Sequence, residues 1–312
     1  MVDMSVSIGK LTLQNPVMPG SGTFAEGMAK VIDLNRLGAI VTKTITSDLR
    51  EGNTPPRVAE LRNSTLFSIG IPSKGPEHYL EELVPFYRNY TPPLVASISA
   101  NTVEEFGELA ARLSVPGVAA IEANISCPNL KKDGQAFGMD PQATEAVIKA
   151  MKRNTDLQVW AKLSPNVGSI AVIARAAEQG GADALVSSNA ILAMAIDIES
   201  HQPKVANLMG GITGSATKPI LLRMAYQAAQ AVSIPVIGCG GIATAEDAIE
   251  YLLAGCTAVQ VGTANFISTS AMPRVIDDLQ AYCVRRGITR IRDLIGAMKV
   301  HEAKLLEARA GL

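Results

Sequence analysis

The chain has 312 residues, a formal net charge of −1, 47% hydrophobic residues and 18% charged residues. That length is enough for a normal core and fits either two average domains or one α/β barrel. The near-neutral charge, without blocks of Lys or Arg, argues against a nucleic-acid partner and against binding to an anionic membrane surface.

Short apolar, β-branched runs alternate with amphipathic segments along the whole chain. Eight runs are predicted strands, at residues 17–18, 39–44, 94–98, 119–124, 158–163, 184–187, 235–238 and 258–262. Runs that are apolar throughout are typical of parallel strands covered on both faces. Eight parallel strands are the number that closes a barrel. We therefore predict a (β/α)8 TIM barrel, with residues 1–312 forming a single domain.

Capping residues mark several helix ends between these strands. The sequence Thr102-Val-Glu-Glu105 predicts a capping box, and Asp140-Pro141 predicts an N-cap followed by proline at the first helical position. The helical pattern from residue 167 to 179 ends at Gly180-Gly181, and the pattern after Thr244 ends at Gly255. Glycine at these positions can adopt the left-handed conformation that closes a helix.

Three connections are too long for simple turns, at residues 47–73, 126–139 and 192–215. Long loops in compact domains are usually functional. All three follow a predicted strand, so we expect them at the carboxyl-terminal face of the barrel, where active sites of this fold are built.

Candidate chemical groups lie at several of the strand ends. Cys127 follows the fourth predicted strand; it is either a small buried residue or a thiolate that can act as a general base. Lys43 and Lys162 end two other strands, and lysine is rarely buried without a partner. Each lysine could be an ordinary ion-pair partner, could stabilise an anionic cofactor, or could form a Schiff base.

Glycine clusters follow the later strands, in Gly210-Gly-Ile-Thr-Gly214, Gly238-Cys-Gly-Gly-Ile242 and Val261-Gly-Thr-Ala264. Bare backbone lets a ligand approach closely, and the loops after the last two barrel strands are a usual phosphate site. The sequence therefore predicts a phosphate-binding site without naming the phosphate.

The four cysteines are too widely spaced for a zinc or iron–sulfur motif and too few for a disulfide scaffold. We expect a reduced, cytoplasmic protein. The three histidines have no partner at metal-ligand spacing, so no metal site is predicted. No apolar stretch is long enough for a transmembrane helix, so we expect no membrane contact.

Six motifs in chain order give a specific resemblance: Asn15-Pro-Val-Met-Pro-Gly-Ser-Gly-Thr-Phe24, Thr42-Lys-Thr44, Asn124-Ile-Ser-Cys-Pro-Asn129, Ala161-Lys-Leu-Ser-Pro165, Gly240-Gly-Ile242 and Gly262-Thr263. From the first strand to the last helix, the chain resembles dihydroorotate dehydrogenases, and most of all the class 1B catalytic subunits. The same flavin barrel occurs in dihydropyrimidine dehydrogenases.

The resemblance implies FMN and oxidation of dihydroorotate to orotate, with a hydride passing to flavin N5 while Cys127 removes a proton. Lys162 would stabilise the negative charge that develops on the flavin. The implied cofactor-binding residues are Ser21, Lys43, Thr44, Ser97, Asn124, Lys162, Ser188, Gly214, Gly240, Gly241, Gly262 and Thr263. The implied substrate-binding residues are Lys43, Phe67, Ser68, Ile69, Gly70, Ile71, Asn124, Asn189 and Ala190.

This sequence departs from the family mainly on the substrate side. The family's Asn-Ala-Ile-Gly-Leu-type loop reads Phe67-Ser-Ile-Gly-Ile71, a second family amide is Ser73, and the Asn-Thr pair is Asn189-Ala190. A flavin-side asparagine is replaced by Ser97. Each buried polar group left unpaired costs about 1–3 kcal/mol. The alternative substrate is therefore dihydrouracil or a less polar cyclic enone.

Two hypotheses from other classes stay open on the residues alone: a Schiff-base lyase that uses Lys162, and a barrel that binds flavin or a partner without catalysis. The resemblance also implies a homodimer and an electron-transfer subunit that carries FAD and a [2Fe–2S] cluster. This chain lacks the cysteine spacing for such a cluster.

Overall fold

The computed structural model describes residues 2–126 and 137–300. A parallel eight-stranded sheet curves into a barrel, in which every strand lies beside its predecessor in the chain. Its strands are β3 (Val17–Pro19), β4 (Ile40–Val41), β7 (Leu94–Ile98), β8 (Val118–Asn124), β9 (Gln158–Lys162), β10 (Ala184–Ser187), β15 (Val236–Cys239) and β16 (Ala258–Val261). Between β3 and β4, the Gly38 N–H donates to the Val17 carbonyl at 2.8 Å. The (β/α)8 barrel predicted from the sequence is confirmed.

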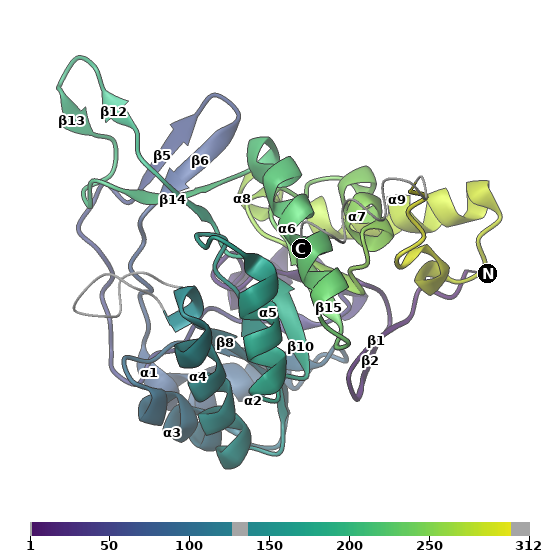
Figure 1. Ribbon diagram of the computed structural model, residues 1–312, viewed down its shortest axis with the longest axis horizontal. Helices are drawn as coiled ribbons and strands as arrows, with labels where there is room; N and C mark the ends of the chain where they lie inside the picture. The colour runs from purple at the N-terminus through teal and green to yellow at the C-terminus, as the bar shows by residue number, and fades with distance from the viewer. Residues whose placement is uncertain (1, 127–136, 301–312) are drawn as a thin grey trace.

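Helices surround the barrel (Figure 1). They are α1 (Gly75–His78), α2 (Val84–Tyr87), α3 (Val103–Leu113), α4 (Pro141–Asn154), α5 (Ile170–Gln179), α6 (Lys218–Ala231), α7 (Ala245–Leu253), α8 (Ala264–Ile267) and α9 (Ala271–Arg286). In α3, Phe106, Leu109, Ala110 and Leu113 are buried, which is the spacing of one helix face. The helices thus cover a barrel wall that is apolar on its outside.

A second, antiparallel sheet lies outside the barrel and was not predicted from the sequence. It has the strand order β11-β14-β6-β5 and combines β5 (Val58–Leu61) and β6 (Ser64–Phe67) with β11 (Ile191–Ala193) and β14 (Gly210–Thr213). Two of the three long connections therefore contain strands. β12 (Ile196–Asp197) and β13 (Gln202–Pro203) extend this arm away from the barrel (Figure 1). A further hairpin, β1 (Val6–Ile8) and β2 (Leu11–Leu13), lies near the amino terminus.

The predicted helix ends agree with the structure except at Gly180 and at the Glu105 carboxylate. Asp140 caps α4, and Gly255, which follows the Ala254 C-cap of α7, has a φ of +107°. At α5 it is Gly181, with a φ of +93°, rather than Gly180, that is left-handed. The predicted capping box at Thr102 is wrong in its second half, because the Glu105 carboxylate accepts from the Asn101 N–H at 2.9 Å and not from the Thr102 N–H.

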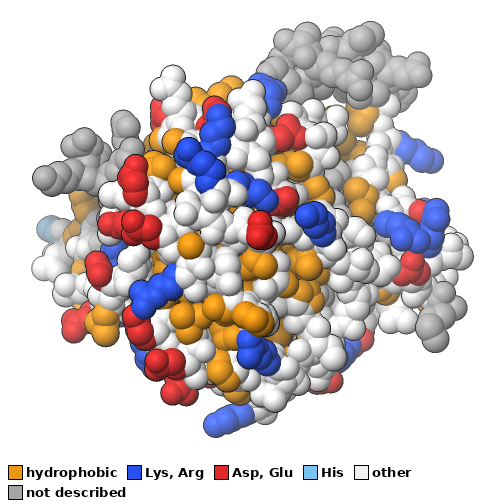
Figure 2. Space-filling view, turned by 90° about the horizontal axis from the view of Figure 1, so that it is seen from below, with side chains coloured by type: hydrophobic (Ala, Val, Ile, Leu, Met, Phe, Trp, Pro, Cys, Tyr) orange, Lys and Arg blue, Asp and Glu red, His pale blue; other side chains and the backbone are white. Residues whose placement is uncertain are grey.

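Charged side chains of both signs are interspersed over the face shown in Figure 2, around hydrophobic side chains near its centre. This face therefore has no field of a single sign. None of the helices within the described ranges combines the length and apolar character needed to span a membrane. Among those same residues, no group of three or more His, Cys, Asp and Glu side chains could hold a metal ion.

Thr102→Ala should lower the free energy of unfolding by about 1 kcal/mol, because the Thr102 hydroxyl accepts from the Glu105 N–H at 3.1 Å at the start of α3. Ser169→Ala is the matched control, since Ser169 occupies the N-cap of α5 without a side-chain capping bond. Urea denaturation of both variants measures the difference. Equal losses in the two variants would contradict the assignment of Thr102 as a stabilising cap.

Candidate active site

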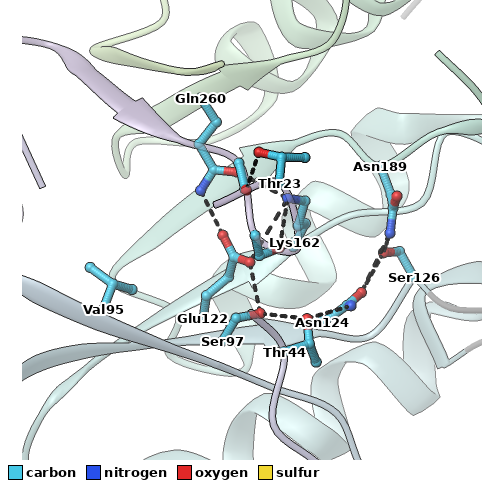
Figure 3. Close-up of polar contacts among 12 residues, drawn as sticks. Thr23, Thr44, Val95, Ser97, Glu122, Asn124, Ser126, Lys162, Asn189 and Gln260 are labelled. Carbon is cyan, nitrogen blue, oxygen red and sulfur yellow. Dashed lines mark hydrogen bonds and ion pairs between the residues drawn. The ribbon is translucent and has the colours of Figure 1, made fainter. Parts of the chain in front are cut away.

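The carboxyl-terminal ends of the barrel strands hold a continuous chain of buried polar side chains (Figure 3). It begins at Lys162, the last residue of β9, whose Nζ donates to Ser21 Oγ at 3.1 Å and to Gln260 Oε1 at 2.9 Å. Gln260 Nε2 in turn donates to Glu122 Oε2 at 2.6 Å. Lys162 Nζ lies 3.8 Å from Glu122 Oε1, so a buried ion pair faces the interior of the barrel.

The chain of hydrogen bonds continues from Glu122 to the neighbouring strands. Ser97 Oγ donates to Glu122 Oε1 at 3.0 Å and lies 3.0 Å from Thr44 Oγ1. Asn124 Nδ2 donates to Thr44 Oγ1 at 3.2 Å. The structure therefore places Thr44, Ser97, Asn124 and Lys162 in one network, although they are up to 118 positions apart in the sequence.

Asn124 also connects the network to the residues after β10. Ser126 Oγ donates to Asn124 Oδ1 at 2.9 Å, and Asn189 Nδ2 donates to Ser126 Oγ at 2.6 Å. Beside Asn189, the Ser188 N–H donates to the Cys239 carbonyl at 3.0 Å. The network thus extends to the start of the outer sheet, where Asn189 is followed by β11.

The sequence analysis assigned no role to Glu122, Gln260 or Ser126. Both Glu122 and Gln260 are fully buried in strands whose other side chains, apart from Asn124 at the end of β8, are apolar. A charged residue within an apolar strand is rarely buried without a partner, and this was the available signal for Glu122. Gln260 is neutral and gave a weaker signal, since its partners come from strands far away in the sequence.

Backbone glycines form a second cluster at the same end of the barrel. Gly214, Gly240 and Gly241 have φ values of +118°, +130° and +69°. A Cβ added to Gly241 would lie 2.9 Å from the Gly214 carbonyl oxygen, so the two loops are in close contact. One added to Gly240 would lie 2.2 Å from Leu221 Cδ1. The cluster therefore requires bare backbone, as a cradle for a phosphate does.

Gly262 and Thr263 join this cluster to the polar network. Thr263 Oγ1 donates to Thr213 Oγ1 at 3.0 Å, next to Gly214. Gly20, which precedes the Lys162 partner Ser21, lies beside Gly262, since a Cβ on it would be in ordinary van der Waals contact with Gly262 Cα at 3.5 Å. The glycine cluster thus adjoins the loop whose Ser21 accepts a hydrogen bond from the buried lysine.

The predicted substrate loop follows β6 and is held by Asn53. Asn53 Nδ2 donates to Ser68 Oγ at 3.0 Å, and the Asn53 N–H donates to the Ile69 carbonyl at 2.9 Å. Gly70 and Ile71 both have positive φ, of +82° and +48°. Ser73 Oγ accepts from the Thr46 N–H at 3.1 Å, so this hydroxyl stabilises the loop.

Two apolar side chains of the predicted substrate site lie beside Gly211. A Cβ on Gly211 would lie 2.7 Å from the Ala190 Cβ and 3.2 Å from Cζ of Phe67. β14 pairs with β6 in the register that sets Gly211 opposite Phe67. The outer sheet therefore brings Phe67 and Ala190 together, although they are far apart in the sequence.

Burial changes the acidity of two groups near the site. It lowers the pKa of Lys43, and the positive charge of Arg57 lowers it further. It raises the pKa of the Cys239 thiol, against the opposing effect of Lys162. Cys239 therefore remains a neutral thiol at neutral pH. Cys127, the predicted base, lies outside the described residues.

The Asp247 carboxylate fastens the glycine loops to each other. It accepts from the Ala243 N–H at 2.9 Å and from the Thr244 N–H at 3.0 Å, in the capping box of α7. It also accepts from Lys218 Nζ at 2.7 Å. Burial opposes its ionisation, but the Lys218 and backbone hydrogen bonds outweigh this and leave its pKa below the ordinary value.

Asp247→Asn should lower the free energy of unfolding at pH 7 by about 1 kcal/mol, because Lys218 loses a charged acceptor while the amide oxygen can still cap α7. The pKa of Asp247 is lowered by folding, so this contribution is present above about pH 4 and is lost as the pH falls further. Urea denaturation at pH 7 and below pH 4 measures the difference. A gap between variant and wild type that widens in acid would contradict the assignment.

Comparisons with known proteins agree with the fold and identify the family. The family model described as dihydroorotate dehydrogenase matches residues 3–283. Proteins named dihydroorotate dehydrogenase B (NAD(+)), catalytic subunit, are 48% identical in Desulforamulus reducens, 45% in Thermoanaerobacter sp. and 46% in Geobacter metallireducens. The matches cover 95–96% of this chain and 98–100% of those proteins. Dihydroorotate dehydrogenases are flavin-dependent oxidoreductases that act on a CH–CH bond. The chain belongs to the dihydroorotate dehydrogenase family.

Proposed function

We propose that this chain is the FMN-dependent catalytic subunit of a cytoplasmic dihydroorotate dehydrogenase that oxidises dihydroorotate to orotate. The observation that carries the proposal is the Lys162 amine, held by Ser21 and Gln260 at the same face as the bare glycine cluster. A buried cation beside a phosphate cradle suits an anionic cofactor. Family membership supplies the reaction. Residues 1–312 would form one FMN-binding barrel domain.

The residues present fit FMN in their chemistry. The bare backbone at Gly214, Gly240, Gly241 and Gly262, with the Thr263 hydroxyl, would hold the phosphate. The ring would be held by Ser21, Lys43, Thr44, Ser97, Asn124, Lys162 and Ser188. FMN, when bound, accepts the hydride that leaves the substrate. The structure gives Thr44, Ser97 and Asn124 fixed positions through their mutual hydrogen bonds, as a preorganised site requires.

The chain's own residues would supply charge and proton transfer. The Lys162 ammonium would stabilise negative charge that develops at the cofactor edge, and its burial strengthens that effect. Cys127 would remove the substrate proton, since a thiolate on an accessible loop can act as a general base. Lys43 and Asn124 would contact both cofactor and substrate. The lowered pKa of Lys43 follows from its burial and from Arg57.

On the substrate side, we propose that Asn124 and Asn189 supply hydrogen bonds to the ring. Residues 67–71 and Ala190 would form the rest of the wall. Phe67 and Ala190, in contact with the Gly211 backbone, would offer an apolar surface where the family places amide and hydroxyl groups. This difference makes substrate preference the sharpest question for this chain. The relatives' names favour dihydroorotate over the dihydrouracil or enone alternative.

The Schiff-base lyase hypothesis has less support. Lys162 Nζ is fixed by two hydrogen bonds and lies 3.8 Å from a carboxylate, which favours a fixed ammonium over a free amine. A nucleophilic lysine needs to lose that proton. A barrel that binds flavin without catalysis would have no need of Cys127. These two hypotheses are distinguished from oxidation by the experiment below.

Anaerobic mixing of the FMN-loaded protein with dihydroorotate should bleach the flavin absorbance, while dihydrouracil should reduce it far more slowly. Cys127→Ser should slow reduction by about 10²–10⁴-fold, because the hydroxyl is a much weaker base than the thiolate. Cys256→Ser is the matched control, since that thiol is fully buried between α7 and β16. Reduction by dihydrouracil alone would overturn the assigned substrate, and unchanged reduction by Cys127→Ser would overturn the assigned base.

A partner subunit is needed if NAD is the final electron acceptor. The relatives are named as catalytic subunits of NAD-dependent enzymes. Among the described residues Cys239, Cys256 and Cys283 are free thiols, and the sequence lacks the cysteine spacing of an iron–sulfur site. We therefore propose that a separate subunit with FAD and a [2Fe–2S] cluster passes the electrons on. Free thiols also fit a reducing, cytoplasmic environment.

We propose in addition that a second copy of the chain covers the outer arm. From residue 191 to 198 exposed and half-buried positions alternate, and the exposed ones are all apolar: Leu192, Met194, Ile196 and Ile198. Ile198 is 78% exposed. β11 is also an edge strand of its sheet. An apolar face on an edge strand suits an isologous contact with an identical chain.

Ile196→Asp should convert the dimer to a monomer, because two carboxylates would be buried at a symmetric interface without partners. Val172→Asp on α5 is the matched control, since Val172 is an exposed apolar residue away from the arm. Sedimentation velocity measures the mass of each variant. Identical masses for Ile196→Asp and wild type would exclude this face as the dimer interface.

A further inference from the structure

The Gln260 amide lies between the two buried charges of the barrel. Its Nε2 donates to Glu122 Oε2 at 2.6 Å, and its Oε1 accepts from Lys162 Nζ at 2.9 Å. Gln260 comes from β16, whereas Glu122 and Lys162 come from the adjacent strands β8 and β9, so the side chain crosses the barrel interior. Figure 3 shows the amide facing both groups.

The orientation of this amide is fixed by chemistry. A lysine ammonium only donates hydrogen bonds and an ionised carboxylate only accepts them. The Gln260 carbonyl must therefore face Lys162 and its NH₂ group must face Glu122. The opposite orientation would set two donors against each other and two acceptors against each other. Gln260 is thus matched to a charged pair, and it is fully buried.

The distance between the Lys162 ammonium and the Glu122 carboxylate is longer than that of a direct hydrogen bond. A direct ammonium–carboxylate hydrogen bond has a length of about 2.7–2.9 Å, but Lys162 Nζ stands 3.8 Å from the nearer Glu122 oxygen. Gln260 and Ser21 accept the lysine hydrogens instead, and Ser97 and Gln260 donate to the carboxylate. The amide therefore keeps the ammonium apart from its counter-charge and directed toward Ser21.

We propose that Gln260 and Glu122 are positioning residues that together set the reduction potential of the bound flavin through Lys162. Gln260 holds the ammonium at the open end of the barrel, and the Glu122 carboxylate offsets part of its positive charge. This inference rests on the proposed function, because it requires Lys162 to face the flavin. Gln260 would stabilise the reduced, more negative flavin by holding the ammonium near it, and Glu122 would destabilise that form by offsetting the ammonium charge. Substitutions of the two residues should therefore shift the reduction potential in opposite directions.

The variants should shift the midpoint potential in opposite directions. Gln260→Met removes the amide, so Lys162 moves toward Glu122 and away from the flavin, and the potential falls. Glu122→Gln removes the counter-charge, so the potential rises, while Glu122→Asp keeps the charge and stays near wild type. We expect shifts of about tenfold in the equilibrium between oxidised and reduced flavin, or ~30 mV for two electrons.

Spectroelectrochemical titration of the FMN-loaded protein measures these potentials. Gln158→Met is the matched control, because Gln158 is also a buried glutamine in a barrel strand, at the amino-terminal end of β9, and its side-chain amide makes no hydrogen bond within the described residues. It should leave the potential unchanged. The inference would be overturned if the midpoint potentials of Gln260→Met and Glu122→Gln both stayed within ~9 mV of wild type, which is a twofold change in the equilibrium between oxidised and reduced flavin.

Acetylation of Lys162 in flavin-free protein gives a second measurement that needs neither flavin nor activity. Withdrawal of the amine toward Glu122 should slow its modification by acetic anhydride severalfold in Gln260→Met relative to Gln158→Met, as quantified by peptide mass spectrometry. Equal rates would overturn the positioning role even where a variant loses flavin. If the wild-type protein does not bind FMN, the proposed function is refuted. The acetylation rates then decide the role of Gln260 by themselves.

Discussion

The buried Lys162–Glu122 pair is the constraint on which the interior of this barrel depends. Two charges removed from water are costly unless their remaining hydrogen-bonding positions are filled. Here Ser21, Ser97 and Gln260 fill them, from strands or loops on different sides of the barrel. Gln260 therefore couples β16 to the pair on β8 and β9, strands that the backbone ladder does not join to β16. Removing any one partner leaves a charged group under-satisfied.

At the carboxyl-terminal end of the barrel, the glycine loops depend on backbone conformation, whereas the barrel interior depends on charged side chains. The backbone at Gly214, Gly240 and Gly241 has positive φ angles, which glycine adopts readily and other residues rarely adopt. The loops that carry them are held by Lys218 and Asp247, whose ion pair lies just outside the glycine cluster. A rigid cradle of bare backbone and a fixed cation thus lie at the same end of the barrel, which is the arrangement that electrostatic preorganisation requires.

The barrel could be predicted from the sequence because apolar runs and helix-capping residues are local features of the chain. Apolar runs such as residues 94–98 coincide with β7, and Asp140 caps α4 as expected. The outer sheet was missed because its strands are short and only partly buried: β5 has no fully buried residue, so the run carries no core pattern. Glu122 and Gln260 were missed for a different reason, since their roles depend on pairing across the barrel, which no local pattern records.

The placement of the departures from the family pattern has a physical logic. Phe67, Ser68 and Ser73 belong to the outer sheet and its loop, and Ala190 lies where the chain enters that sheet. The barrel core does not depend on their polarity, since Asn53 and the Thr46 N–H satisfy the two serines locally. Substitutions there can alter the wall that we propose for the substrate without disturbing the Lys162 network. The proposed recognition of the substrate ring can therefore change while the interior that we propose for the cofactor stays fixed.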